Sequence, residues 1–170
     1  VCPHHFTLCS DDMPLGDTNY KMNPPLRTRE DVEALRQGLK EDIIDVIATD
    51  HAPHAKEEKN DSMLRAPFGI VGLETAAALT YSELVLGGYL TVMQMAEKMS
   101  YHPARVLGID KGSLQEGKTA DIVIFDPEKT YTIDAAGFAS KSRNTPFHGR
   151  QVTGAVRATI AGGEVIYQAR

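Results

Sequence analysis

The feature that most constrains the fold is an apolar, β-branched run that leads directly into acidic and imidazole side chains. Residues 43–47 are mostly isoleucine and valine, which predicts a buried strand. Asp50, His51 and His54 follow at once, and Pro53 prevents a simple helical continuation. Acid and imidazole groups at the C-terminal end of a strand are typical of the active-site mouth of a parallel β/α structure. Their oxygen and nitrogen donors suit a divalent metal and proton transfer.

Composition excludes several classes of partner. The 170 residues have a formal net charge of −5 and no basic cluster, which argues against a nucleic-acid partner. No apolar run is long enough to cross a membrane. Cys2 and Cys9 are too few for a disulfide scaffold, so we expect a cytoplasmic protein. Cys2 is interpreted as a small buried hydrophobe in preference to a metal thiolate.

Helix caps and apolar spacing predict the helical segments. Thr28 is the expected N-cap of the first helix, whose apolar stripe comprises Val32, Leu35, Leu39 and Ile43. Later helices are expected over residues 73–86, residues 91–100 with a capping box at the start, and residues 102–108.

The loops differ in what they predict. The polar stretch up to Arg27 is long for a connection, and such loops are usually functional. Its residues 19–27 could present hydrogen-bond donors to a polar ligand, and a plain proline-stiffened connection is equally compatible. Residues 56–61 are interpreted as a charged, solvated loop. Residues 67–72 form a second loop with two glycines, leading into a helix.

The chain divides into two parts of different character. Residues 1–111 have an α/β pattern, whereas residues 112–170 are β-rich. Within the second part, strands are expected over residues 120–127, residues 130–133 and a hairpin of residues 154–160 and 164–167. The fold class is therefore α/β with a small β module behind it.

The candidate site residues also have purely structural interpretations. Residues 1–8 look like a strand end that runs into a loop, so at most one of His4 and His5 would face a given site. From that dipeptide alone a surface or capping pair is favoured. Asp50 could be only a helix N-cap, but the crowding of His51 and His54 around it favours function.

Six segments together resemble bacterial class I dihydroorotases, which are metal-dependent cyclic amidohydrolases of pyrimidine biosynthesis. They are residues 2–6, 18–27, 48–54, 67–75, 112–117 and 140–147. Hydantoinases and allantoinases share the general layout and remain alternatives. Two motifs are more similar to those of dihydroorotases than to those of hydantoinases or allantoinases. They are Asn-Pro-Pro-Leu-Arg over residues 23–27 and Asp-His-Ala-Pro-His over residues 50–54.

The resemblance implies a fold and a set of roles. Residues 1–111 would be the last strands and helices of a distorted (β/α)₈ barrel, and residues 112–170 part of a composite β-sandwich. Zn²⁺ would be the metal, as one or two ions. The implied site comprises His4, preferred over His5, as metal ligand; Asp50 as metal ligand and general base; Asn23 on the dihydropyrimidine ring; His54 on the substrate carboxylate; and backbone groups of Pro67 and Gly69 on the ring amide. The substrate would be dihydroorotate, or carbamoyl-aspartate in the reverse cyclisation.

The sequence also departs from that family. The family's His-x-His metal pair, its His-x-Arg substrate arginine, a bridging acid and a further histidine ligand have no counterpart here. About three barrel strands are expected, where a full barrel needs eight and about 250 residues. We therefore expect the C-terminal part of a dihydroorotase, inactive alone. One alternative is a subunit of a split enzyme, completed by a chain carrying the missing half. Another is a non-catalytic assembly module, as inactive relatives are with aspartate transcarbamoylase. The partners that we expect to be possible are a second copy of the chain, as a homodimer, or aspartate transcarbamoylase.

Overall fold

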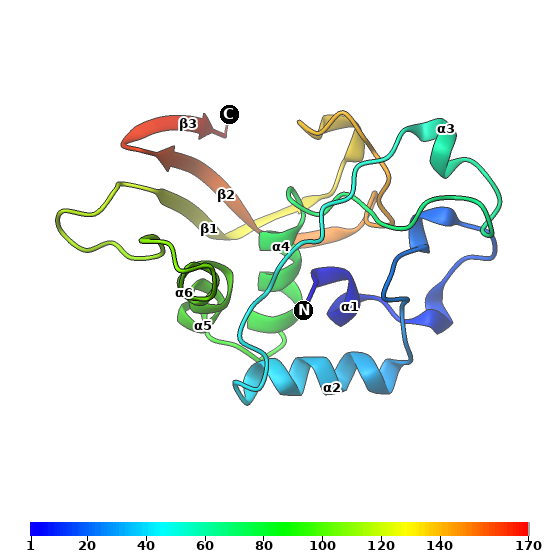
Figure 1. The fold of residues 1–170 in the computed structure, drawn as a ribbon, viewed down its shortest axis with the longest axis horizontal. Coiled ribbons are helices and arrows are strands. Elements are labelled where there is room, and N and C mark those ends of the chain that lie inside the picture. Colours follow the sequence, from blue (N-terminus) through cyan, green and yellow to red (C-terminus); the bar gives the residue numbers. More distant parts are fainter. Residues whose placement is uncertain (170) are drawn as a thin grey trace.

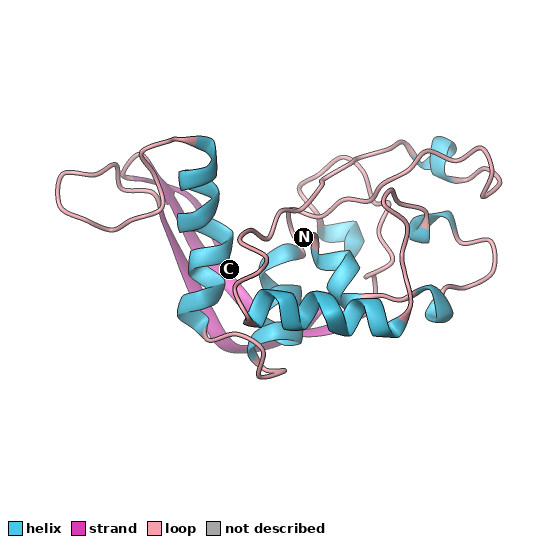
Figure 2. Ribbon diagram, turned by 60° about the horizontal axis from the view of Figure 1, so that its bottom comes forward, coloured by secondary structure: helices cyan, strands magenta, loops and turns pink. Residues whose placement is uncertain are grey.

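The computed structural model describes residues 1–169 and shows an α/β protein with one small antiparallel sheet. The helices are α1 (Pro3–Thr7), α2 (Arg29–Lys40), α3 (Lys56–Lys59), α4 (Ala76–Thr80), α5 (Val92–Ala96) and α6 (His102–Leu107). The strands are β1 (Ile122–Thr132), β2 (Gln151–Ala161) and β3 (Glu164–Gln168), in the order β1-β2-β3. The sheet and the helices α5 and α6 lie at one end of the molecule, and long loops occupy the other (Figures 1 and 2).

Helix α2 begins where its cap predicts. The Thr28 hydroxyl accepts a hydrogen bond from the Asp31 N–H at 3.3 Å, and the Asp31 carboxylate accepts one from the Thr28 N–H at 3.1 Å. Val32 and Leu39 are buried as expected. Ile43 is 72% exposed, so its place in the apolar stripe is wrong. The helix has ended at Lys40, and the chain has already turned away from its axis.

Residues 43–47 do not form the predicted strand. The backbone that they pair with is Val1, whose amino group donates to the Val46 carbonyl at 2.8 Å and whose carbonyl accepts from the Ala48 N–H at 2.9 Å. This is a single rung of parallel-type pairing. A strand needs a repeated ladder of such bonds, and in the described residues Val1 supplies only one rung, because the chain turns into α1 at Pro3.

The start of the chain is a helix, not the expected strand end. Pro3 occupies the first turn of α1, where a missing N–H group costs nothing and the fixed φ of proline suits the helix. Figure 1 shows α1 between α2 and α4, near the middle of the molecule. Phe6 of α1 is fully buried there and belongs to a core cluster with Leu39 and Leu84.

The two helices expected over residues 91–108 are one continuous run. Thr91 caps it through the predicted box with Gln94. A π-helical turn, Glu97–Tyr101, joins α5 to α6 just before Pro103, which has no N–H group to donate back along the helix. The Lys98 carbonyl instead accepts from the Ile47 N–H at 2.9 Å, so this helix holds the segment that precedes Asp50. The helix expected over residues 73–86 is likewise present as α4 and a π-helical turn, Tyr81–Val85.

Strand β1 merges the two strands expected over residues 120–133. Its pairing with β2 is shifted between Asp126 and Thr130. There the Asp126 carboxylate accepts hydrogen bonds from the N–H groups of Glu128 and Lys129, which forms a local turn and leaves Pro127 outside the ladder. The hairpin of β2 and β3, expected from Gly162 and Gly163, is confirmed.

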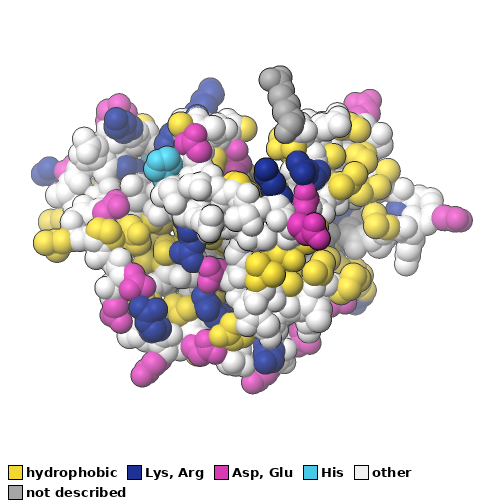
Figure 3. All heavy atoms as spheres, turned by 180° about the vertical axis from the view of Figure 1, so that it is seen from behind, with side chains coloured by type: hydrophobic (Ala, Val, Ile, Leu, Met, Phe, Trp, Pro, Cys, Tyr) yellow, Lys and Arg dark blue, Asp and Glu magenta, His cyan; other side chains and the backbone are white. Residues whose placement is uncertain are grey.

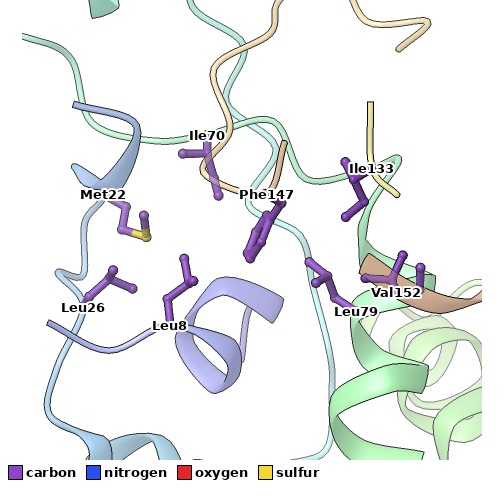
Figure 4. Packing of buried hydrophobic residues seen from close by; sticks show 9 residues of the cluster. Leu8, Met22, Leu26, Ile70, Leu79, Ile133, Phe147 and Val152 are labelled. Carbon is purple, nitrogen blue, oxygen red and sulfur yellow. The ribbon is translucent and has the colours of Figure 1, made fainter. Parts of the chain in front are cut away.

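The main hydrophobic core joins segments that are far apart in sequence. In Figure 4, Leu8, Met22, Leu26 and Ile70 meet Leu79, Ile133, Phe147 and Val152. At the sheet end, by contrast, hydrophobic side chains gather on the surface (Figure 3), and Val165, Ile166 and Tyr167 of β3 are each at least half exposed. A search of residues 1–169 found no helix with the length and apolar character that a membrane span requires.

Candidate active site

The segment around Asp50 and the loop of residues 67–72 lie side by side. A parallel bridge links His51 to Ile70, and the Ala52 N–H donates to the Ile70 carbonyl at 2.9 Å. Gly69 has a φ of +110°, and a Cβ there would lie 2.5 Å from the Ala52 Cβ. Only glycine permits this approach. The glycine-containing loop of the sequence is thus the partner of the Asp-His segment.

Asp50 lies at the turn between two anchored points of the backbone. On one side Ala48 pairs with Val1, and on the other His51 pairs with Ile70. Asp50 adopts a φ of +48° and is exposed. Aspartate is one of the few residues that tolerate the left-handed region. The conformation therefore presents a carboxylate at the surface, on a backbone that is held on both sides.

The two histidines after Asp50 have different partners. The His51 Nδ1 accepts from the N–H groups of Gly72 and Leu73 at 3.0 and 3.4 Å, so this ring fastens the loop. The His54 Nε2–H group donates to the Phe68 carbonyl at 2.9 Å, and the His54 side chain is 24% exposed. The His54 Nδ1 lies 3.7 Å from the Glu58 carboxylate. One ring nitrogen of His54 therefore binds the loop, and the other faces Glu58.

The backbone of residues 67–69 is largely satisfied inside the protein. The Pro67 carbonyl accepts from Lys59 Nζ at 3.0 Å, and the Gly69 carbonyl accepts from Lys59 Nζ at 3.1 Å and Asn144 Nδ2 at 3.2 Å. The Gly69 N–H donates to the Lys21 carbonyl at 2.9 Å. The Phe68 N–H, between the two residues that the sequence singled out, donates no hydrogen bond to any part of residues 1–169. It is the available N–H donor of residues 67–69.

Two polar residues of this region were missed by sequence reasoning. Lys59 is only 5% exposed, so the interpretation of residues 56–61 as solvated is wrong at this position. Burial, and then the positive charge of Lys21, lower the pKa of Lys59. Asn144 is 6% exposed and also donates to the Ala52 carbonyl at 2.9 Å. Asn144 lies in one of the segments that resemble the family, residues 140–147, but the sequence indicated no role for it. No feature of the charged residues 56–61 indicated that Lys59 is buried.

Three potential metal ligands cluster at the start of α1. Donor atoms of Cys2, His4 and His5 all lie within 4.8 Å of one another. The expectation that His4 and His5 face opposite ways is wrong, because they lie on a helix, and their ring centroids are 4.2 Å apart. His4 is 2% exposed and its Nε2 has no hydrogen-bond partner in the described chain. Burial, His5 and the N-terminal charge lower its pKa to about 3, so its imidazole is neutral.

His5 connects this cluster to Asn23. The His5 Nε2–H group donates to the Pro24 carbonyl at 2.8 Å, and the flanking Met22 and Leu26 are buried in the main core. Asn23 itself is exposed between these anchors. Its loop is thus fixed beside α1.

Asp50 lies within electrostatic reach of the same cluster. Burial raises the pKa of the Cys2 thiol, and the negative charge of Asp50 raises it further, although the nearby N-terminal charge opposes both. Asp50 is not among the residues whose donor atoms lie within 4.8 Å of one another. The structure therefore brings Asp50, His54, Pro67 and Gly69 together and places His4 and Asn23 in a neighbouring group.

Comparison with known proteins gives a consistent result. A model described as the amidohydrolase family matches residues 14–166. The chain is 57% identical over 171 residues to a dihydroorotase of Pelotomaculum thermopropionicum, and 52% identical over 168 residues to one of Bacillus subtilis. These alignments cover 100% and 99% of the chain but only 40% and 39% of the relatives. The chain thus spans about two fifths of the length of the curated relatives that it matches.

Solved structures with a similar fold include a dihydropyrimidinase and an L-hydantoinase. A dihydropyrimidinase from Brevibacillus agri matches with a TM-score of 0.90 and 28% identity, over 99% of this chain and 38% of that one. An L-hydantoinase from Arthrobacter aurescens matches with a TM-score of 0.89 and 32% identity, over 98% of this chain and 38% of that one.

Proposed function

This chain belongs to the amidohydrolase family, and from that premise we propose that it is the C-terminal part of a dihydroorotase. The complete protein would hydrolyse the ring amide of dihydroorotate to N-carbamoyl-L-aspartate and catalyse the reverse cyclisation. Identities of 57% and 52% to dihydroorotases, against 28% and 32% to the dihydropyrimidinase and the L-hydantoinase, support this substrate. The chain alone would be inactive, because it contains only part of the expected ligand set.

The observation that carries the proposal is the bridge between His51 and Ile70. It joins the segment that carries Asp50 and His54 to the loop that carries Phe68. This supports a site that combines a carboxylate, an imidazole and a free amide donor. A cyclic amide that carries a carboxylate needs these three kinds of group: a base, a group that binds the carboxylate, and a donor for the ring.

Asp50 would carry the proton. As the oxygen of the attacking water bonds to the ring carbonyl carbon, the Asp50 carboxylate accepts a proton from that water. When the ring carbon–nitrogen bond breaks, Asp50 returns the proton to the leaving nitrogen. The reverse cyclisation uses the same transfers in the opposite order. Its exposed position on a held backbone leaves Asp50 accessible to substrate.

Substrate binding would fall to groups around Asp50. His54 would bind the substrate carboxylate through its exposed edge, and Asn23 would contact the dihydropyrimidine ring. Residues Pro67 to Gly69 would bind the ring amide. Because the Gly69 N–H and the carbonyls of Pro67 and Gly69 have internal partners, the Phe68 N–H is the group of that loop that is free to do so.

The residues present fit a divalent metal. His4 offers a buried, neutral imidazole with an unpartnered Nε2, which is the form that binds metals. The equivalent atom of His5 is occupied by the Pro24 carbonyl, which favours His4 as the ligand. Asp50 would supply a carboxylate oxygen. A bound metal supplies Lewis-acid activation of water and of the amide carbonyl. We propose zinc, as one or two ions in the complete enzyme.

The architecture of the complete protein follows from the same family. Residues 1–111 would form the last strands and helices of a (β/α)₈ barrel, and residues 112–170 would form part of a composite β-sandwich. The partner would be the N-terminal half, in the same chain or in a complementary one. Homodimerisation and association with aspartate transcarbamoylase are further proposals. The cytoplasm is the proposed location, since both cysteines are free.

The test is an assay of the complete protein with dihydroorotate, for the parent and for Asp50→Asn. We expect the amide to reduce kcat by about 10²–10⁴-fold, because it cannot accept the proton. Asp45→Asn is the matched control, since Asp45 is also exposed and precedes the site in the same segment. Near-normal kcat in Asp50→Asn would refute the base assignment. Robust turnover by the isolated 170-residue chain with zinc would refute the proposal that it is only part of the enzyme.

A hydantoinase-type activity is the second candidate, and the similar folds of the two hydrolases above favour it. Its substrates would be neutral cyclic amides. The complete protein should therefore also be assayed with hydantoin and dihydrouracil. Turnover of these neutral rings in preference to dihydroorotate would replace the first proposal with the second.

A further inference from the structure

Lys59 is a buried cation with no carboxylate partner among the described residues. Its side chain is almost wholly enclosed, and Nζ donates to the carbonyls of Pro67 and Gly69 at 3.0 and 3.1 Å. The Lys21 carbonyl lies at 3.5 Å. A buried ammonium group is costly unless each of its three donors finds an acceptor, and here three backbone carbonyls surround it. The backbone carbonyls around Lys59 therefore compensate for the burial of its ammonium group.

The bond to Pro67 also sets the direction of the neighbouring amide. In a trans peptide the carbonyl of one residue and the N–H of the next point in opposite directions. Because the Pro67 carbonyl points to Lys59, the Phe68 N–H points away from it. The next carbonyl, of Phe68, accepts from His54. One ammonium group and one imidazole thus fix two successive peptide planes of the loop.

We infer that Lys59 is a positioning residue, which orients the Phe68 N–H and holds the 67–69 backbone against His54. This inference rests on the proposed function, in which that N–H binds the substrate ring. Lys59 itself touches no substrate. Thr18 helps to hold Lys59 in place, because the Thr18 hydroxyl donates to the Lys59 carbonyl and fixes the end of α3. Loss of the ammonium group would leave the Pro67 carbonyl without a partner and the peptide plane free to rotate.

The experiment uses the complete protein and compares Lys59→Met with Lys56→Met. Lys56 lies on the same helix, is exposed, and its side chain makes no hydrogen bond within residues 1–169. We expect Lys59→Met to raise KM for dihydroorotate on the order of 10–100-fold with a smaller change in kcat. Deuterium uptake over residues 64–69 should rise in parallel. Lys59→Gln, which keeps two N–H donors, should recover most of the loss, and Lys56→Met should match the parent.

Parent values of KM or of deuterium uptake in folded Lys59→Met would overturn the inference, as would an equal change in Lys56→Met. If Lys59→Met does not fold, Thr18→Val is tested in its place. We then expect a smaller rise in KM and in deuterium uptake, and parent values of both would overturn the inference. Failure of the proposed function is distinguishable, because the parent would then not turn over dihydroorotate. The deuterium measurement would still show whether Lys59 holds the loop.

Discussion

The candidate-site loops and the three-stranded sheet are held together in different ways. In the loops, the successive carbonyls of residues 67–69 accept hydrogen bonds from two side chains, Lys59 and His54, and Asn144 adds a third at Gly69. In the sheet, backbone groups of β1, β2 and β3 pair repeatedly with one another, and many side chains face outward. A repeated ladder tolerates the loss of any one side chain, whereas a loop held by a few side chains does not. Substitutions that remove a hydrogen-bonding side chain should therefore act sharply at the site and weakly in the sheet.

The largest expected effect marks the limit of that comparison, because it adds an atom to the sheet and does not remove a hydrogen-bonding side chain. Gly154 of β2 has a φ of +96°, and a Cβ there would lie 2.4 Å from the Phe125 ring and 2.9 Å from the Tyr81 ring. Gly154→Ala should lower the free energy of unfolding of the complete protein by about 3 kcal/mol, through backbone strain and overpacking. Gly137→Ala is the control, because nothing lies within 4 Å of its added Cβ. Equal stability of the two variants in urea denaturation would contradict the prediction.

The next effect tests the loops. Asn144→Asp preserves shape but replaces the donating Nδ2 with an acceptor, so that the carbonyls of Ala52 and Gly69 lose a donor. We expect a loss of about 1–3 kcal/mol in the free energy of unfolding, because the Ala52 carbonyl is left unpaired and the Gly69 carbonyl keeps only Lys59. Asn60→Asp is the matched control, since Asn60 is exposed. A loss no greater than that of Asn60→Asp would show that the loops do not depend on this side chain.

The smallest effect concerns an ion pair on the sheet surface. Arg157 Nε donates to the Asp126 carboxylate at 3.0 Å across β1 and β2, and both side chains are partly exposed. Arg157→Met should shift the urea midpoint less than either change above, because exposed pairs contribute little. Bonds from the Glu128 N–H and then from Arg157 lower the pKa of Asp126 below 3.8. Its stabilising contribution is therefore complete above pH 3.8 and is lost as the pH falls through the lowered value.

The stabilising contribution of Asp126 predicts how Arg157→Met changes the pH dependence of the urea midpoint. Arg157→Met should reduce the fall of the urea midpoint below pH 3.8 only slightly, since the Glu128 N–H is the largest cause of the shift and remains. A midpoint change at neutral pH as large as that of Gly154→Ala would show that the sheet also depends on single side chains.

Local signals in the sequence predicted several elements correctly. The N-cap at Thr28, the capping box at Thr91 and the hairpin at Gly162 and Gly163 each depend on residues that are close in the chain. The strand over residues 43–47 was wrong because a strand is defined by its partners, and the described chain offers one rung. The strand at residues 1–8 was wrong because Pro3 begins a helix as readily as it ends a strand.

The candidate site divides along the same line. Asp50, His54, Pro67 and Gly69 could be selected from motifs and a family resemblance, because residue type and short-range order are visible in a sequence. Their roles remain proposals. Lys59 and Asn144 could not be selected, because their roles depend on the backbone carbonyls to which they donate. Those carbonyls belong to segments that are distant in the sequence or not marked by any local pattern.

By itself, the sequence determined the family, the helix caps, the hairpin and the residue types available for chemistry, because these depend on local order. Only the tertiary structure decided that His51 pairs with Ile70 and that the rings of His4 and His5 lie 4.2 Å apart at the start of a helix. It also decided that the one buried lysine of α3 faces three carbonyls. The physical reason is that burial and hydrogen-bond partners are set by segments distant in sequence, and no local pattern specifies which carbonyl a buried donor will reach.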